Sequence, residues 1–349
     1  MGILRLLFAL SIVVYHAHEP HGLFLFDQQA AILSFFIISG FYMALILDGK
    51  YQSKFTFYVS RALRIFPLYW IALSLTLILG FIKIYLHLGS EETAITHYFQ
   101  YSTYLSGVPA ITEFVNFILR NFTLILTRDY FFIQDNLAPG YLIVNPAWTL
   151  QIELMFYALA PFLVRIKKNF LLFALFYITL FYGIIEPFSL VPQHTLINSF
   201  LKYFLFFLLG TVSYRYIYKY LKKPKLTKLP LMTFIFFLLF ITFYQFLPGR
   251  ILEKSFLFGL CYYIAFALSI PYFFTLTKRN ALDRFIGELS YPVYITHMIF
   301  AKILFSLHIP TVPFLNSVLI AIPTILFSIF LVLVIQNPID RMRHKKLRS

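Results

Sequence analysis

Long apolar runs recur along the whole chain, and they limit its fold more than any other feature. We identify ten of them, and most are near the length of a helix that crosses the hydrocarbon core of a bilayer, although the first and fourth are short. Charged residues make up 12% of the chain and hydrophobic ones 60%, whereas about 25% of a soluble domain is charged. We therefore predict an all-α, polytopic integral membrane protein with about ten transmembrane helices. The predicted segments are residues 3–18, 29–47, 65–87, 147–164, 169–186, 197–217, 229–247, 256–276, 284–305 and 314–335.

Lys and Arg residues gather in alternate loops, and this bias predicts the orientation. If both termini are cytoplasmic, 22 of the 29 Lys and Arg residues lie on the inner side. Inner loops carry such an excess in membrane proteins, so we predict cytoplasmic termini. The transmembrane domain then covers residues 1–336, and a short basic cytoplasmic tail covers 337–349. Because the topology explains the net charge of +15, we expect membrane lipid and no nucleic acid as a partner.

Residues 114–133 are apolar and long enough to span the membrane, yet they contain several polar side chains, among them Arg120 and Asn121. A spanning helix here would move the basic loop at 165–168 to the outer side. We therefore predict an interfacial or re-entrant helix within a long outer loop. The spanning alternative stays open.

The first apolar run has two basic side chains on one helical face. Arg5 and His16 are eleven positions apart, which places them within about 20° of each other and about 16 Å apart along a helix. A phosphate held by Arg5 would let an arm such as the pantetheine of coenzyme A reach the His16 imidazole. Arg5 could instead serve only as an orientation signal. The acids near His16 have no recognisable ligand spacing, so we predict no metal site.

Three further ionisable residues are candidates for chemistry. Arg61 and Arg64 lie in the second inner loop and would point the same way on a helix. Paired guanidinium groups bind phosphate, although basic residues beside a membrane helix also set topology or contact anionic lipid. Glu153 lies about 8 Å below the start of its predicted helix at Trp148. This depth matches His16, so the carboxylate could orient the imidazole or form a structural contact between helices.

Ser290, Tyr294 and His297 share one face of the ninth predicted helix. This polar stripe could line a substrate tunnel, to which we also assign Ser39 and Trp148. The alternative is that the stripe forms hydrogen bonds between helices and that the small residues at Ser39 allow close packing.

Five motifs in chain order resemble the membrane acyltransferase 3 family, the bacterial sugar O-acyltransferases. They extend over nearly the whole chain. They are the Arg-x10-His pair Arg5 and His16, FFIISGF at 35–41, SRALRIFPLY at 60–69, PAWTLQIELMFYALAP at 146–161 and IGELSYPVYITHMI at 286–299. The resemblance implies acyl transfer from cytosolic acyl-CoA to an acceptor at the outer face of the bacterial inner membrane. It also implies that His16 is catalytic and that Arg5, Arg61 and Arg64 hold the donor.

The chain departs from the family pattern at three positions. Thr149 stands where the family usually has Ser, and Gly2 where it often has an acidic residue. Gln336 occupies a position where Glu is frequent. The last two departures concern the inner face and leave the expected chemistry unchanged.

The resulting hypothesis is that His16, oriented by Glu153, acts as general base on a saccharide hydroxyl that attacks the thioester. An acyl-imidazole formed on His16 is an alternative route. The rival class is a proton-coupled transporter without acyl chemistry, because intramembrane His, Glu and Arg also build proton pathways. We expect no tightly bound cofactor. Acetyl is the expected group, and O-antigen or another exopolysaccharide is the expected acceptor, but no motif identifies either, and the oligomeric state is not readable.

Overall fold

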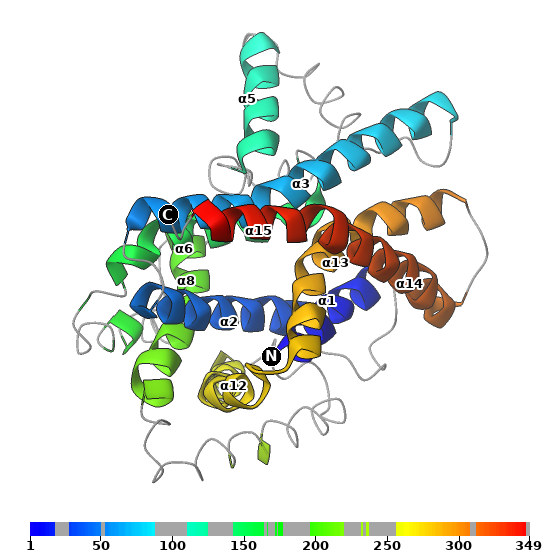
Figure 1. The fold of residues 1–349 in the computed structure, drawn as a ribbon. Coiled ribbons are helices and arrows are strands. Elements are labelled where there is room, and N and C mark those ends of the chain that lie inside the picture. The colour runs from blue at the N-terminus through cyan, green and yellow to red at the C-terminus, as the bar shows by residue number, and fades with distance from the viewer. Residues whose placement is uncertain are drawn as a thin grey trace.

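The structure is a computed structural model, and every extended element that it describes is helical (Figure 1). It describes residues 1–17, 28–49, 53–87, 110–124, 142–163, 196–219, 256–307 and 312–346, together with residues 166, 172, 174–176, 232 and 235–236.

The described helices follow one another in this order. They are α1 (Gly2–His16), α2 (Gln28–Gly49), α3 (Lys54–Tyr85), α5 (Ala110–Thr123), the 3-10 turn η3 (Asn145–Ala147), α6 (Trp148–Leu163), α8 (Leu196–Val212) with its π-helical extension η6 (Ser213–Tyr218), α12 (Phe256–Thr277), α13 (Ala281–Ser306), and α14 (Pro313–Leu331), which continues through the π-helix η8 (Val332–Gln336) into α15 (Asn337–Lys346).

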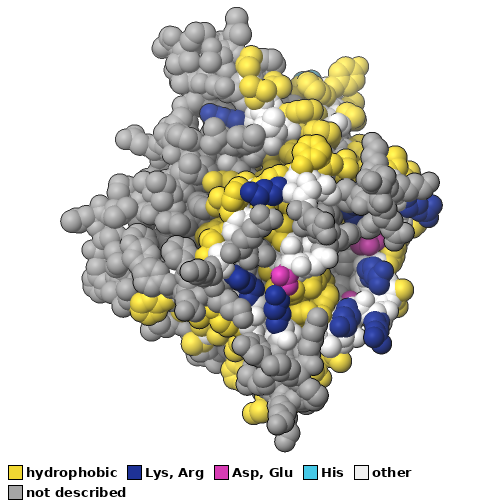
Figure 2. Space-filling model, turned by 60° about the vertical axis from the view of Figure 1, so that its left-hand side comes forward, with side chains coloured by type: hydrophobic (Ala, Val, Ile, Leu, Met, Phe, Trp, Pro, Cys, Tyr) yellow, Lys and Arg dark blue, Asp and Glu magenta, His cyan; other side chains and the backbone are white. Residues whose placement is uncertain are grey.

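Four described helices are long and apolar enough to cross a membrane, and each falls on a predicted segment. Helices α1, α6, α8 and α13 occupy four more predicted segments, whereas 169–186 and 229–247 lie almost entirely outside the described residues. Hydrophobic side chains also cover much of the described surface in Figure 2. The all-α class is therefore confirmed for the described residues, and the count of ten helices and the orientation of the termini stay predictions. The four helices are Gln28–Gly49, Lys54–Tyr85, Gly259–Thr277 and Phe314–Arg343.

Two helix pairs form the centre of the fold, α1 with α13 and α2 with α8. Glycines allow the backbones of α2 and α8 to touch. A Cβ added to Gly40 would lie 2.0 Å from the carbonyl oxygen of Phe207, and one added to Gly210 would lie 1.9 Å from that of Ile37. No Cβ fits at such a distance, so Gly40, which follows Ser39, and Gly210 allow α2 and α8 to pack closely.

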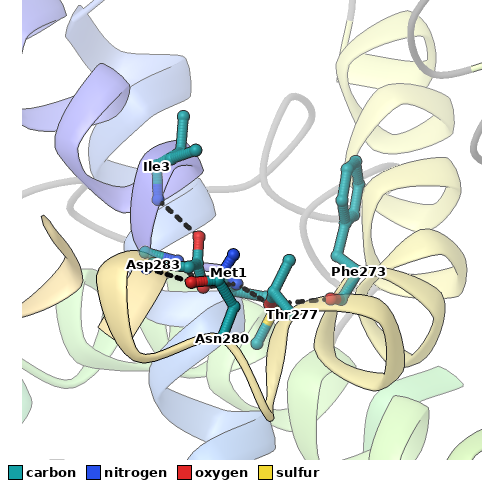
Figure 3. A network of polar contacts seen from close by, with 7 residues as sticks. Met1, Ile3, Phe273, Thr277, Asn280 and Asp283 are labelled. Carbon is teal, nitrogen blue, oxygen red and sulfur yellow. Dashed lines mark hydrogen bonds and ion pairs between the residues drawn. The ribbon is translucent and has the colours of Figure 1, made fainter. Parts of the chain in front are cut away.

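Asp283 of α13 holds the first turn of α1 (Figure 3). Its carboxylate accepts hydrogen bonds from the N–H groups of Gly2 at 2.8 Å and Ile3 at 3.0 Å, and from the Met1 amine at 2.6 Å. A carboxylate at this point satisfies N–H groups that have no partner within the helix and complements its positive end. Asp283 thus places a carboxylate beside Gly2, the position at which the family resemblance expects an acidic residue.

Helix α3 begins at Lys54, eleven residues before the predicted boundary. Arg61 and Arg64 therefore lie within the helix and not in a loop, which corrects the prediction. The apolar run breaks at these two charges, and hydropathy alone cannot recognise arginines that face the interior of a protein. The tail predicted at 337–349 is likewise helical as far as Lys346.

Helix α5 attaches to the middle of α3 through its last turn. Tyr69 donates a hydrogen bond to the carbonyl of Asn121, and the Trp70 indole donates to that of Phe122 at 3.0 Å. The Asn121 side chain accepts a hydrogen bond from the N–H of Ile143 at 3.0 Å. With 14 residues, α5 is shorter than a helix that crosses the bilayer. The prediction for 114–133 stays a prediction, since residues 125–133 lie outside the described part.

Candidate functional site

A cavity of about 410 Å³ lies between α1, α2, α3, α6, α12 and α13. Seven of the ten predicted site residues line it. His16, His297 and Trp148 do not, and the Trp148 ring packs 5.7 Å from that of Tyr203 instead. The seven are Arg5, Ser39, Arg61, Arg64, Glu153, Ser290 and Tyr294.

One end of the cavity is strongly basic. The exposed side chains of Lys278 and Arg284 lie there, together with Arg343 of α15. Arg343 forms an ion pair with Asp340 at 2.8 Å, and its Nη1 lies 3.5 Å from the carbonyl oxygen of Ser60. Figure 2 shows Lys and Arg side chains gathered with a few acidic ones in the lower part of one face. We call the part of the cavity lined by Lys278, Arg284 and Arg343 the basic end.

Arg5, Arg61 and Arg64 also line the cavity, as their shared predicted role requires. Arg61 is buried, and its guanidinium carbon lies 6.0 Å from the centre of the Tyr157 ring. The guanidinium groups of Arg5 and Arg64 make no hydrogen bond or ion pair within the part of the chain that the structure describes. Two cations that face a cavity without a protein partner can bind a phosphate group there.

Glu153 lines the cavity and is half-buried on α6. Its Oε1 accepts hydrogen bonds from the Ser39 hydroxyl at 2.9 Å and from the Tyr157 hydroxyl. Neither of its described hydrogen bonds involves His16. The predicted partnership between the Glu153 carboxylate and the His16 imidazole is therefore not formed, because Glu153 faces α2 and its own helix.

Hydroxyl groups surround the end of the cavity farthest from Lys278. The hydroxyl oxygens of Thr149 and Tyr294 lie 2.8 Å apart, and the Tyr294 hydroxyl donates to the carbonyl of Pro146 at 2.9 Å. Thr149 therefore retains the hydroxyl of the usual Ser. Ser290 donates to the carbonyl of Gly287 at 2.7 Å, so its hydroxyl is used within α13.

A pair of histidines lies one helical turn beyond Tyr294. The rings of His16 and His297 are 5.2 Å apart between centroids. His297 is fully buried, and its Nδ1 lies 2.7 Å from the carbonyl oxygen of Tyr294. Gln28 Nε2 lies 3.2 Å from His16 Nε2. Since an amide nitrogen can only donate, His16 Nε2 is the acceptor of this contact.

A family model described as an acyltransferase domain matches residues 1–335. The chain belongs to the acyltransferase 3 family. No curated protein and no solved structure matches this acyltransferase. Membership and the apolar helices together indicate a membrane-bound acyltransferase in general terms.

Within the described residues of this acyltransferase, no three His, Cys, Asp or Glu side chains are grouped as a metal site would require. His18 and His21, which follow His16, lie outside the described residues.

Several residues that line the cavity of this acyltransferase were not predicted from the sequence. Tyr157 follows Glu153 by four positions, a spacing that places both on one helical face. That signal was available in the sequence. The basic residues Lys278, Arg284 and Arg343 were assigned to inner loops and the tail, where charge alone does not distinguish a binding site from a topology signal. The half-buried Glu288 also lies among these cations.

Proposed function

We propose that this acyltransferase moves an acyl group, with acetyl as the expected one, from cytosolic acyl-CoA to a hydroxyl of an extracytoplasmic saccharide in the bacterial inner membrane. The observation that carries the proposal is the cavity itself. It begins among cations, two of which lack a described protein partner, and it ends one helical turn from the His16 and His297 pair. Such a cavity suits a donor with phosphates at one end and a reactive thioester at the other.

The spacing of residues along α1 and α13 supports this assignment. A Cβ added to Gly287 would lie 3.7 Å from Nη1 of Arg5, so the two residues lie side by side. From this level, eleven positions of α1 lead to His16 and ten positions of α13 lead to His297. At 1.5 Å per residue these are about 16 Å and about 15 Å. The two helices agree on the distance from the cations to the imidazoles, which an extended pantetheine arm can bridge.

The proposed chemistry uses His16 as the base. The imidazole removes the proton of the acceptor hydroxyl while the oxygen attacks the thioester carbonyl carbon. The tetrahedral intermediate then collapses, the carbon–sulfur bond breaks, and the imidazolium returns the proton to the thiolate. The products are the ester and free coenzyme A. In the alternative route, His16 Nε2 itself attacks the carbonyl, the carbon–sulfur bond breaks, and coenzyme A leaves as the thiolate. The acceptor hydroxyl then attacks the acyl-imidazole, the carbon–nitrogen bond breaks, and the hydroxyl proton passes to the thiolate, so that the imidazole is regenerated.

The orientation follows from the same proposal. The basic end of the cavity faces the cytoplasm, where acyl-CoA is made, and both termini lie on that side. Met1 and Arg343 both line the cavity, which supports a common side for the two ends of the chain.

The test is acyl transfer in membranes that contain wild-type protein or His16→Ala at matched protein levels. Radiolabelled acetyl-CoA is the donor, and label in the polysaccharide fraction is the readout. Lys219→Ala is the control, since this exposed residue pairs with Asp48 and does not line the cavity. Transfer by wild type and Lys219→Ala but not by His16→Ala supports the proposal. Equal transfer by all three would exclude His16 as the base.

If no variant transfers label, the assay is repeated with longer acyl-CoA donors. Failure with these as well would favour the transporter class.

A further inference from the structure

We propose that Glu153 binds the donor and does not orient His16. Its carboxylate accepts an amide N–H of the pantetheine arm, and this contact helps to place the thioester at His16. The inference rests on the proposed function and assigns a substrate contact within the same cavity.

The two carboxylate oxygens of Glu153 differ in their hydrogen bonds. The hydroxyls of Ser39 and Tyr157 both donate to Oε1. Among the described residues, no donor lies within hydrogen-bond distance of Oε2. A carboxylate that is removed from water needs hydrogen-bond donors, and burying one without them is costly. Oε2 therefore has capacity for a ligand in the cavity that Glu153 lines.

The charges around Glu153 restrict the type of ligand that can pass it. Arg5, Arg61 and Arg64 line the cavity together with Glu153, and anionic groups of a ligand bind to them. A negative charge beside the Glu153 carboxylate would be repelled, so phosphates stay near the cations. The part of the ligand that passes Glu153 must be uncharged and must offer an N–H or O–H donor. Secondary amides of a pantetheine arm meet both conditions.

The level of Glu153 between the cations and the imidazoles indicates which amide it contacts. Thr149 lies at the level of Tyr294, and Glu153 is four residues farther along α6, about 6 Å towards the cations. His297 lies three residues beyond Tyr294 in the opposite direction, about 4 Å. Glu153 is thus about 10 Å from the level of the imidazoles. In an extended pantetheine thioester, the second amide nitrogen lies roughly 9 Å from the sulfur, from ordinary bond lengths. Glu153 therefore matches the second amide better than the first, whose nitrogen lies roughly 4 Å from the sulfur.

The experiment removes the amide from the substrate and the carboxylate from the protein in a double-mutant cycle. Acetyl-pantetheine contains both amides, whereas acetyl-N-acetylcysteamine contains only the first. The kcat/KM for each is measured with wild type, Glu153→Ala and Glu153→Gln. Asp48→Asn is the control for expression, because Asp48 pairs with Lys219 and does not line the cavity.

We expect Glu153→Ala to lower kcat/KM for acetyl-pantetheine by about tenfold or more, the size expected for a hydrogen bond to a charged group. The same substitution should change kcat/KM for acetyl-N-acetylcysteamine by less than about threefold. Glu153→Gln retains an acceptor oxygen and should fall between wild type and Glu153→Ala. Equal losses on both donors, or an altered pH dependence of kcat, would overturn the inference and return Glu153 to the reacting centre.

Two further outcomes are informative. If Glu153→Ala does not accumulate in membranes, Glu153→Gln supplies the same ratio between donors, and a ratio equal to that of wild type overturns the inference. If the truncated thioester reacts too slowly, its inhibition of transfer from acetyl-CoA is compared with that by acetyl-pantetheine. Absence of transfer from acyl-CoA by the wild type refutes the proposed function itself, whereas transfer with an unchanged donor ratio refutes only the role of Glu153.

Discussion

The imidazole ring of His297 lies against that of His16, with 5.2 Å between the ring centroids. The Nδ1–H of His297 donates to the carbonyl of Tyr294, so its Nε2 has the lone pair. That nitrogen is buried, and it has no hydrogen-bond partner among the described residues. A neutral, fixed ring therefore forms one wall beside His16 and restricts where the His16 ring can lie.

His297→Ala should lower kcat by about 100-fold and leave the KM for acyl-CoA nearly unchanged. The substitution opens space beside His16, and a small displacement of a catalytic group can cost about this factor. His297 does not line the cavity, so donor binding should be retained. His297→Phe, which keeps a ring against His16, should recover part of kcat. Steady-state kinetics with acetyl-CoA checks this, and a raised KM with intact kcat would show instead that His297 serves donor binding.

Arg343→Ala should raise the KM for acyl-CoA several-fold with little change in kcat. Arg343 lines the basic end of the cavity, far from the imidazoles, and a phosphate bound there gains one charge-assisted hydrogen bond. Arg341→Ala is the matched control, because Arg341 is exposed on the same helix and does not line the cavity. The KM is measured at low and high salt. Identical effects of the two substitutions would mean that only the overall charge of α15 matters.

Gly40→Ala should destabilise the protein by about 1–3 kcal/mol or more, the usual range for overpacking. The added Cβ would meet the backbone of Phe207, which cannot move without separating α2 from α8. Gly49→Ala is the control on the same helix, since a Cβ there has nothing within 4 Å. Thermal unfolding in detergent should show a lower midpoint for Gly40→Ala alone. A midpoint equal to that of Gly49→Ala would mean that the two helices lie farther apart.

Much of the fold follows from the sequence, because hydropathy reports which residues face lipid. It predicted the helical class and the location of α2, α12 and α14 to within a few residues. It failed at the start of α3, where Arg61 and Arg64 face a cavity inside the protein. Hydropathy averages over all faces of a helix, so it cannot assign a charge to the inner face.

The composition of the site was also largely predictable, and its pairing was not. Helical spacing predicted that Arg61 and Arg64 point the same way, and both line one cavity. It also gave the expected distance between Arg5 and His16 along α1. Glu153 was paired with His16 on depth alone. The level predicted for Glu153 was itself wrong, since Glu153 lies about 10 Å nearer the cations than the imidazoles do. The rotation of α6 then decides its neighbours, and these are Ser39 and Tyr157. Asp283 was missed because its partners are the Met1 amine and backbone N–H groups, which have no signature in a sequence.

Asn121→Ala should destabilise the attachment of α5 to α3 by about 1–3 kcal/mol. The side-chain oxygen of Asn121 accepts the N–H of Ile143, and both residues are buried, so the substitution leaves that N–H without its partner. Because Ile143 precedes η3 and α6, the helix of Glu153, activity should fall together with stability. Thr123→Ala is the control, because Thr123 is a half-buried residue on the same turn whose hydroxyl donates to the carbonyl of Leu119 within α5. Limited proteolysis of both variants in membranes checks the prediction. Equal resistance of Asn121→Ala and wild type would show that Asn121 is dispensable for the docking of α5.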